Sequence, residues 1–365
     1  MTEVPFVDLA AAHAEVDRQV RAGFDRVLAK CAFVQGPDVA AFEREYAHFN
    51  GAPHAVGLAN GTDALELALR ALFHTRGTEP GAEVVLPANT FVATAEAVVR
   101  AGARPVLVDA EPADLLMDAD LAAAAVTPAT GAIVPVHLYG RLAPLERLLH
   151  LGPPVLEDAA QSQGAARDGR HLTGAIAATS FYPGKNLGAY GDAGAVVTGS
   201  AELARTVRLL RDHGSERKYE HEIVGFNSRL DTLQAVVLRA KLRRLEGWNE
   251  QRRAAAARYA ELLAGIPGVV LPRPAGEEHV WHLYVVRVPR RDEVAARMGE
   301  LGIGVGIHYP VPVHLQPGFA YLGHGPGDFP VAEAAAERIL SLPMFPQITE
   351  DQQQRVADAL RKALG

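Results

Sequence analysis

The 365-residue sequence contains one cysteine, Cys31, so no disulfide can form within the chain. Long apolar runs are also missing, because no stretch approaches the roughly twenty uncharged residues that span a membrane as a helix. The first residues, MTEVPFVDL, lack the basic start and apolar core of a signal peptide. A formal net charge of −7 argues against general binding to nucleic acid or anionic membranes. These absences predict a cytoplasmic protein with neither nucleic-acid nor membrane partners.

Several catalytic signatures are absent too. The sequence contains neither a dinucleotide-binding fingerprint nor the phosphate-binding pattern G-x-x-x-x-G-K-[ST]. It also lacks the G-x-S-x-G turn that carries a nucleophilic serine. The histidines do not cluster with cysteines or carboxylates at metal-ligand spacing, so we expect no metal site; the scattered ones include His213, His221, His282 and His308.

The first two hundred residues alternate short apolar runs, rich in β-branched side chains, with helical patterns. This alternation predicts an α/β fold with a mostly parallel sheet flanked by helices. The expected strands cover residues 54–58, 83–87, 104–110, 132–138, 154–160, 178–182 and 193–199.

The sequence pattern changes near residue 230, where a long charged stretch with helical periodicity begins and runs to about residue 265. The remainder predicts a small α+β region with strands at 280–289 and 303–309 and helices at 291–302 and from about 350. We therefore expect a large α/β domain over residues 1–245, including an N-terminal helical segment, and a small C-terminal α+β domain over residues 246–365.

The stretch SFYPGKNLGAYGDAGAVV, residues 180–197, places Lys185 among small residues between two apolar segments. Stripping a lysine of water costs several kcal/mol unless the amine is paired or neutralised, so a shielded lysine favours a chemical role. A lysine in an exposed surface loop is the alternative.

A second candidate follows the strand at 54–58, where Asn60, Gly61 and Thr62 form a turn that opens a helix. Asp63 and Glu66 have the spacing of a capping box. Free N–H groups and the helix dipole make such a helix start a seat for an anion. A plain capped helix start would show the same pattern.

The third candidate is PPVLEDAAQSQGA, which ends an apolar strand with Glu157 and Asp158, at the edge where ligands gather in open α/β sheets. One of the two carboxylates must point inward, and it needs a cation: an arginine, a metal or a protonated ring nitrogen. Capping of the next helix or an ion pair with arginine remains possible for Asp158.

The three candidates together match the needs of pyridoxal phosphate. The helix start binds the phosphate, the aspartate keeps the ring nitrogen protonated so that the ring accepts electrons, and the lysine binds the cofactor covalently.

These motifs and several others resemble the DegT-like family of sugar aminotransferases, fold-type-I pyridoxal-phosphate enzymes that act on nucleotide-linked keto sugars. The resemblance covers nearly the whole chain. The motifs that carry it are VPFVDL, GLANGTDALELAL, PANTFVATAEAV, VHLYG, EDAAQSQGA, SFYPGKNLGAYGDAGAVVT, GFNSRLDTLQAVVLRAKL, IHYPVPVHLQP and LSLPMFP.

The resemblance implies catalytic roles for Lys185, which would bind the cofactor covalently, and for Asp158, which would pair with the ring nitrogen. Phe91 would stack on the ring and Gln161 would lie near its hydroxyl group. The phosphate would be held by Gly61, Thr62, Ser180 and, from the other subunit of a homodimer, Asn227. The substrate site would be formed by Tyr182, His308, Tyr309 and, from the partner subunit, Arg229.

A basic stretch, RTVRLLRDHGSERKYEH, adds a further substrate candidate. Arg205, Arg208 and Arg211 recur every third residue, as on a solvated helix face. The less regular segment around Lys218 is a better candidate for a loop that meets the substrate diphosphate.

The expected function is transfer of an amino group, with glutamate as the expected donor, to C3 of a dTDP-linked 3-keto-6-deoxyhexose. A UDP-linked 3-keto sugar acid and a 4-keto nucleotide sugar are the alternative substrates. A dehydratase of this fold is disfavoured, because in such relatives histidine replaces the lysine at position 185. A cofactor-binding regulator is disfavoured by the acidic chain and the lack of a DNA-binding segment.

Overall fold

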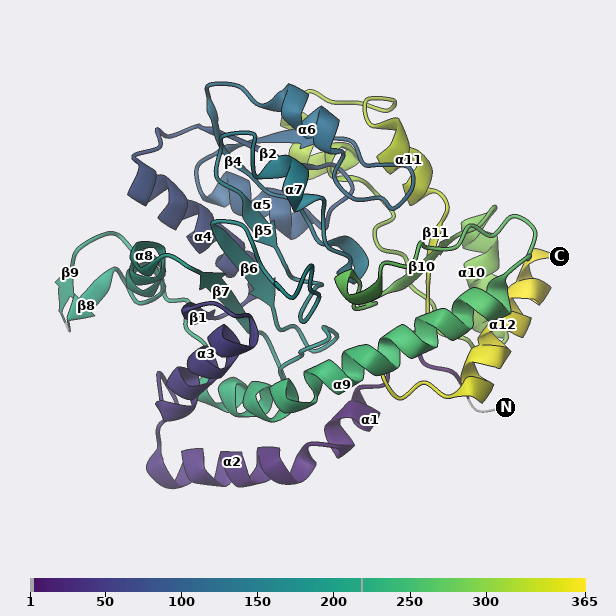
Figure 1. Cartoon of the computed structure of the whole chain (residues 1–365), viewed down its shortest axis with the longest axis horizontal. Coiled ribbons are helices and arrows are strands. Elements are labelled where there is room, and N and C mark those ends of the chain that lie inside the picture. Colours follow the sequence, from purple (N-terminus) through teal and green to yellow (C-terminus); the bar gives the residue numbers. More distant parts are fainter. Residues whose placement is uncertain (1–2, 218) are drawn as a thin grey trace.

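The structure, a computed structural model, describes residues 3–217 and 219–365 (Figure 1). Its central sheet contains β1 (His54–Leu58), β2 (Glu83–Pro87), β3 (Arg104–Val108), β4 (Thr130–Ile133), β5 (Leu156–Asp158), β6 (Ile176–Ser180) and β7 (Gly194–Thr198). The strand order is β3, β2, β4, β5, β6, β7, β1, with parallel bridges between Ile133 and Val155 and between Val136 and Asp158 joining β4 to β5. The mostly parallel α/β fold predicted from the sequence is therefore confirmed.

The exception is β7, which runs antiparallel to both of its neighbours, β6 and β1. Antiparallel neighbours need no crossover helix, so residues 181–193 connect β6 to β7 as a loop. Hydrogen bonds from Phe181 N to Ala193 O and from Ala189 N to Phe181 O close this loop. Lys185 lies within it, directly beyond the end of the sheet.

Helices cover both faces of the sheet. One face carries α4 (Gly61–Arg76), α5 (Val92–Arg100) and α8 (Ala201–Arg211); the other carries α3 (Pro37–Phe49), α6 (Ala119–Ala125), α7 (Leu145–Leu148) and the first half of α9 (Thr232–Leu263). Alternate strand residues serve the two faces: Val56 and Val196 pack under α4, whereas Ala55 and Val197 pack under α3.

The helix α9 links two regions of the core. Leu238 and Leu245 pack with α3 and the sheet, whereas Tyr259 and Leu263 pack with the C-terminal elements. These elements are β10 (Tyr284–Arg287), α10 (Arg291–Glu300), β11 (Ile339–Leu342) and α12 (Glu350–Leu364). The helix α11 (Pro330–Ala336) instead contributes Ala332 to the core around α4 and α5. The change of packing partners along α9 supports a division after residue 245, which remains a proposal.

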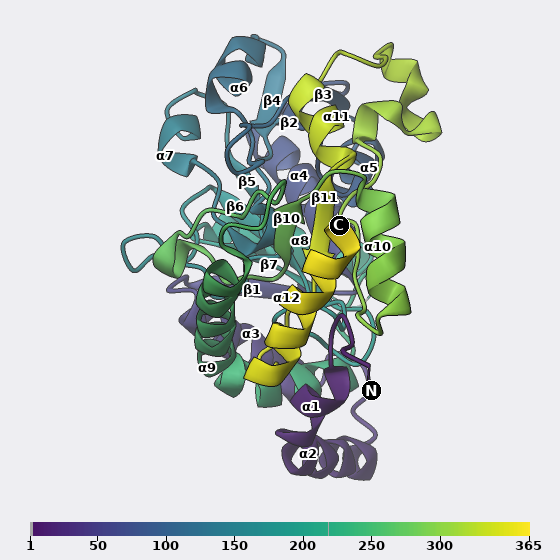
Figure 2. The ribbon, with the colours of Figure 1, turned by 90° about the vertical axis from the view of Figure 1, so that its right-hand side faces the viewer.

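Figure 2 shows α12 beside α9, with α1 (Leu9–Ala14) and α2 (Asp17–Lys30) below them. The remaining strands, β8 (Ser215–Arg217) and β9 (Glu220–His221), form a hairpin that projects from the body next to α8 (Figure 1). Within the described ranges, no helix combines the length and the apolar character needed to cross a membrane.

Two local expectations are wrong. The strand predicted at 303–309 is absent, and this segment makes only isolated bridges, through Ile303 and Gly306. A side chain at Gly304 would collide with the backbone of Phe6, so the segment is held by close approach rather than by a ladder. The expected capping box at 63–66 is also absent, because Asn60 caps α4 by accepting a hydrogen bond from Asp63 N.

Candidate active site

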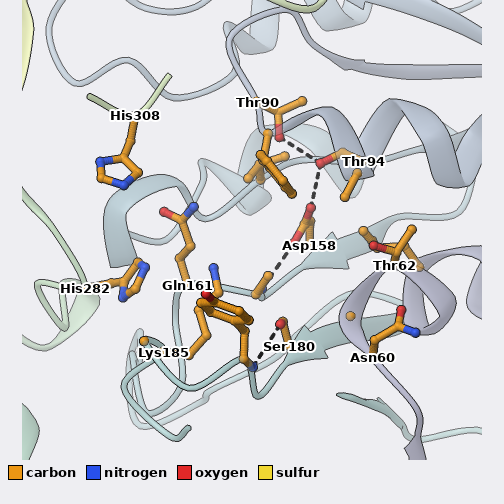
Figure 3. Close-up of a pocket in the computed structure, with 18 of the residues that line it drawn as sticks. Asn60, Thr62, Thr90, Thr94, Asp158, Gln161, Ser180, Lys185, His282 and His308 are labelled. Atoms are coloured by element: carbon orange, nitrogen blue, oxygen red, sulfur yellow. Dashed lines mark hydrogen bonds between the residues drawn. The ribbon is translucent and has the colours of Figure 1, made fainter. Parts of the chain in front are cut away.

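A cavity of about 740 Å³ opens where the carboxyl ends of β5 and β6 meet the start of α4 and the C-terminal region (Figure 3). The carboxyl ends of parallel strands are the usual place for ligands in open α/β sheets. The predicted site residues that line it are Gly61, Thr62, Phe91, Asp158, Gln161, Ser180, Tyr182, Lys185, His308 and Tyr309. The fold thus brings residues that lie almost 250 positions apart in the chain into one cavity.

Asp158 is the last residue of β5 and is 4% exposed. Its Oδ2 accepts a hydrogen bond of 2.8 Å from the Thr94 hydroxyl, and its Oδ1 accepts one of 3.1 Å from Ala160 N. Because Thr94 donates to the carboxylate, its oxygen is left to accept from Thr90, at 2.7 Å. Burial raises the pKa of Asp158, while these hydrogen bonds and Lys185 oppose the rise.

Lys185 lies in the loop between β6 and β7, where its backbone N–H donates a hydrogen bond to the carbonyl oxygen of Tyr182. Burial lowers the pKa of its amine to about 8, although the nearby charge of Asp158 opposes that change. An amine with this pKa is neutral in a substantial fraction of molecules near pH 8, whereas an exposed lysine is almost fully protonated. The cavity therefore holds a lysine prepared to act as a nucleophile or a base.

The start of α4 faces the same cavity. Gly61 opens the helix, and Thr62 follows it in the first turn, where N–H groups have no partner within the helix. A side chain at Gly61 would place its Cβ 2.5 Å from the Cβ of Ser180, so only glycine fits here. The result is a narrow anion-binding site, with N–H groups on one side and the Ser180 hydroxyl on the other.

The wall of the cavity near Gln161 is tied together by hydrogen bonds. Gln161 Oε1 accepts from Tyr139 N at 2.6 Å, and Gln161 Nε2 donates to the Tyr309 hydroxyl at 3.1 Å. The Tyr139 hydroxyl donates to His308 O at 2.6 Å. Phe91 is half exposed, and its ring centre lies 5.1 Å from that of Tyr309. A flat ring that enters the cavity would therefore meet an aromatic face without displacing the core.

Two of the predicted residues, Asn227 and Arg229, do not line this cavity. Asn227 is exposed, and Arg229 forms an ion pair with Asp212 at 3.0 Å. Lys218 lies outside the described residues. The assignment of Asn227 and Arg229 to the site of a partner subunit remains a prediction.

Sequence reasoning missed some residues that shape the site. Thr90 and Thr94 support Asp158, and His282 lines the cavity wall near Lys185 (Figure 3). The available signal was the four-residue spacing of the two threonines: Thr90 precedes the N-cap of α5, and Thr94 lies in its first turn. The expectation that one of the two acids at 157 and 158 points inward was incomplete: both are buried, and Glu157 contacts His137 at 2.8 Å.

The arrangement fits pyridoxal phosphate. Gly61, Thr62 and Ser180 form a binding site for its phosphate, and Asp158 is a buried carboxylate for its ring nitrogen. Lys185 is a partly buried amine with a lowered pKa, suited to covalent attachment. The fold and the site thus define a pyridoxal-phosphate enzyme of the aminotransferase class.

The sequence model of the DegT/DnrJ/EryC1/StrS aminotransferase family matches residues 15–361, so the chain belongs to this family. A dTDP-3-amino-3,4,6-trideoxy-α-D-glucose transaminase from Streptomyces venezuelae is 47% identical over 98% of this chain and 96% of that relative. A UDP-N-acetyl-3-dehydro-α-D-glucosamine 3-aminotransferase from Acidithiobacillus ferrooxidans is 45% identical over the whole of this chain and 98% of that protein.

The structural comparison agrees. The crystal structure of S. venezuelae DesV in complex with a ketimine intermediate superimposes with a TM-score of 0.95. That structure shares 46% sequence identity and covers 99% of this chain and 98% of its own. The protein is therefore an aminotransferase that depends on pyridoxal phosphate.

The close contact between Gly61 and Ser180 allows a test of where the cofactor phosphate binds. In Gly61→Ala, the added Cβ must displace Ser180 or the start of α4, so we expect cofactor affinity to fall about tenfold or more, equivalent to roughly 1.4 kcal/mol. Fluorescence titration of cofactor-free protein with pyridoxal phosphate measures the change. Gly247→Ala is the matched control, because Gly247 is an exposed position of α9 with open space for a Cβ. Unchanged affinity in Gly61→Ala would place the phosphate elsewhere.

Proposed function

We propose that the enzyme transfers an amino group from glutamate to C3 of a dTDP-linked 3-keto-6-deoxyhexose. The observation that carries this proposal is that a partly buried Lys185 with a lowered pKa and the buried Asp158 line one cavity, together with His308 and Tyr309. The names of the two relatives above support C3 as the aminated carbon, because both place the amino group there.

Each buried group has a distinct task in this reaction. When bound, pyridoxal phosphate supplies an electron-withdrawing ring that stabilises negative charge at the carbon bearing the amino group. Asp158 keeps the ring nitrogen protonated, and Thr94 holds the carboxylate in place. Lys185, once its amine is free and neutral, takes the proton from the α carbon of the amino donor. The low pKa of this amine makes the neutral form available near pH 8.

The acidic lining of the cavity favours a sugar substrate without a carboxylate. Besides Asp158, the acidic residues Asp63, Glu96 and Asp192 line the cavity, whereas its cations are Lys185 and Arg100. Arg100 already pairs with Asp63 and Glu66. A carboxylate on the sugar would meet more acids than free cations in this chain, which favours a neutral deoxysugar. Tyr182, His308 and Tyr309 would fix the sugar by hydrogen bonds to its hydroxyl groups.

The same charge balance supports a homodimer with shared sites. A nucleotide diphosphate needs cations, and the cavity of one chain supplies few. Arg229 and Lys218 of a second copy, together with Asn227 for the phosphate, would complete the site. The reaction would take place in the cytoplasm, where a protein with a single cysteine needs no oxidising environment.

A comparison of substrates tests the proposed reaction. With glutamate as donor, we expect amination of the dTDP-linked 3-keto-6-deoxyhexose and at least a hundredfold lower kcat/KM with the 4-keto isomer, because the wrong carbon would lie out of reach of the amine. Mass spectrometry and NMR of the product identify the aminated carbon. The UDP-linked 3-keto sugar acid is the third substrate to test. Amination only at C4, or activity only with the sugar acid, would refute the proposal.

The shared site predicts complementation between inactive chains. Lys185→Ala and Arg229→Ala should each be inactive alone, but mixed dimers regain one intact site. After subunit exchange we expect about one quarter of wild-type activity, since half of randomly mixed dimers are mixed and each holds one working site of two. Exchange is verified by native mass spectrometry of differently tagged chains. No recovery after proven exchange would show that Arg229 serves its own chain or no site.

A further inference from the structure

Glu157 is a buried acid that the catalytic steps leave unused. It precedes Asp158 in β5, is fully buried and does not line the cavity. Its Oε1 accepts hydrogen bonds from two backbone N–H groups, Thr173 N at 2.7 Å and Gly174 N. Its Oε2 lies 2.8 Å from Nε2 of His137, which is also fully buried. Both carboxylate oxygens are therefore committed to partners within the chain.

The hydrogen bonds of His137 determine which of its ring nitrogens carries the proton. Nδ1 accepts a hydrogen bond of 3.0 Å from Ala143 N, so Nδ1 bears no hydrogen. The hydrogen must then lie on Nε2, which donates it to Glu157. The backbone N–H of His137 donates to Asp158 O at 3.1 Å. His137 thus fixes both ends of the loop 137–143 and joins that loop to the carboxylate of Glu157.

The loop closed by His137 holds Tyr139 in a conformation that needs support. Tyr139 has a φ of 62°, in the left-handed region that residues other than glycine rarely adopt. In this conformation its backbone N–H donates to Gln161 Oε1 at 2.6 Å, and its hydroxyl donates to His308 O at 2.6 Å. Any shift of the loop would therefore move Gln161 or release it.

Tyr139 fixes the orientation of the Gln161 amide. Because a backbone N–H only donates, the amide oxygen must face Tyr139, and Nε2 must face the other way. One hydrogen of Nε2 goes to the Tyr309 hydroxyl at 3.1 Å. Within the described part of the chain the second hydrogen has no acceptor, and Gln161 lines the cavity. The amide therefore offers one N–H donor to an oxygen of a bound ligand.

The place of Gln161 indicates which oxygen that is. In pyridoxal phosphate, the ring hydroxyl and the phosphate arm flank the aldehyde carbon on opposite sides. Figure 3 shows Gln161 and the phosphate site, marked by Asn60 and Thr62, on opposite sides of Asp158. With the phosphate bound at the start of α4, the ring hydroxyl would therefore face Gln161.

We propose that Glu157 and His137 are positioning residues for the cofactor: through the loop 137–143 they keep the free N–H of Gln161 directed at the hydroxyl oxygen of the ring. Neither residue touches the cofactor, and both act through Tyr139 and Gln161. The hydrogen-bonded chain thus links the back of the sheet to one atom of the ligand. This role depends on the cofactor and not on the identity of the sugar.

Replacement of Glu157 by glutamine disrupts the pair with almost no change of shape. The new amide oxygen would accept from the two backbone N–H groups, so its NH2 group would face the Nε2–H of His137, and two donors would meet. His137 cannot transfer its hydrogen to Nδ1 without losing the hydrogen bond from Ala143 N. We therefore expect the loop to move and Gln161 to lose its contact with the ring hydroxyl.

The test compares two ligands by calorimetric titration of full-length protein freed of cofactor. One is pyridoxamine phosphate, which binds without a covalent bond, and the other is its 3-deoxy analogue, which lacks the ring hydroxyl. In Glu157→Gln, affinity for pyridoxamine phosphate should fall about tenfold, while affinity for the analogue should stay within about twofold of wild type. His137→Asn, which can accept from Ala143 N but cannot reach Glu157, should behave alike. Gln161→Leu should show the same selective loss, and adding Glu157→Gln to it should change nothing further.

Asp109→Asn is the matched control. Asp109 is another buried carboxylate that accepts from backbone N–H groups, those of residues 110, 331 and 332, and it does not line the cavity. Its substitution should leave the ratio of the two affinities unchanged.

Equal losses for the two ligands in Glu157→Gln, or no loss for either, would overturn the proposal. If that variant does not fold, ¹⁵N NMR of wild-type protein with labelled histidine takes its place: a hydrogen on Nε2 of His137 is expected, and a hydrogen on Nδ1 would overturn the proposal. Because neither sugar nor amino donor is present, failure of the proposed substrate would leave these results unaffected.

Discussion

The site depends on one electrostatic constraint: a buried carboxylate, Asp158, and a partly buried amine, Lys185, line the same cavity, and burial disfavours the charged form of each. Asp158 has a raised pKa and Lys185 a lowered one, so neither is in a favourable state without a ligand between them. A ring with a nitrogen at one end and a reactive carbonyl carbon at the other satisfies both groups at once. The rest of the site positions these two groups relative to each other.

The fold provides this arrangement through strand ends. Asp158 ends β5, and Ser180 ends the neighbouring parallel strand β6, so both lie at one edge of the sheet. The antiparallel strand β7 is what returns the chain after a short loop and keeps Lys185 at that edge. Behind the loop, α9 contributes buried polar side chains: Lys241 donates to Gly188 O, and Asn249 contacts Asn186. A single long helix therefore supports the lysine loop and also connects it to the C-terminal wall of the cavity.

Much of this could be predicted from the sequence, because apolar periodicity reports burial and turn residues report strand ends. The seven strands, the long helix and the convergence of Gly61, Asp158 and Lys185 follow from such local patterns. Long-range contacts do not. Nothing local distinguishes a buried Glu157 held by His137 from a surface acid, and the contact of His282 Nδ1 with Asn186 Oδ1 joins residues 96 positions apart. The segment at 303–309 has the composition of a strand, but its glycines serve close packing against the N-terminal residues.

The central claim is that Asp158 makes the cofactor ring an electron acceptor while Lys185 holds and releases it. Measurement of single-turnover amino transfer from glutamate in Asp158→Asn tests it most directly. We expect the rate to fall by about a thousandfold or more, equivalent to roughly 4 kcal/mol of transition-state stabilisation, with the cofactor still attached to Lys185 in the absorption spectrum. Asp192→Asn, at an exposed acid on the rim of the same cavity, should retain most of the activity. A near-normal rate in Asp158→Asn would contradict the account.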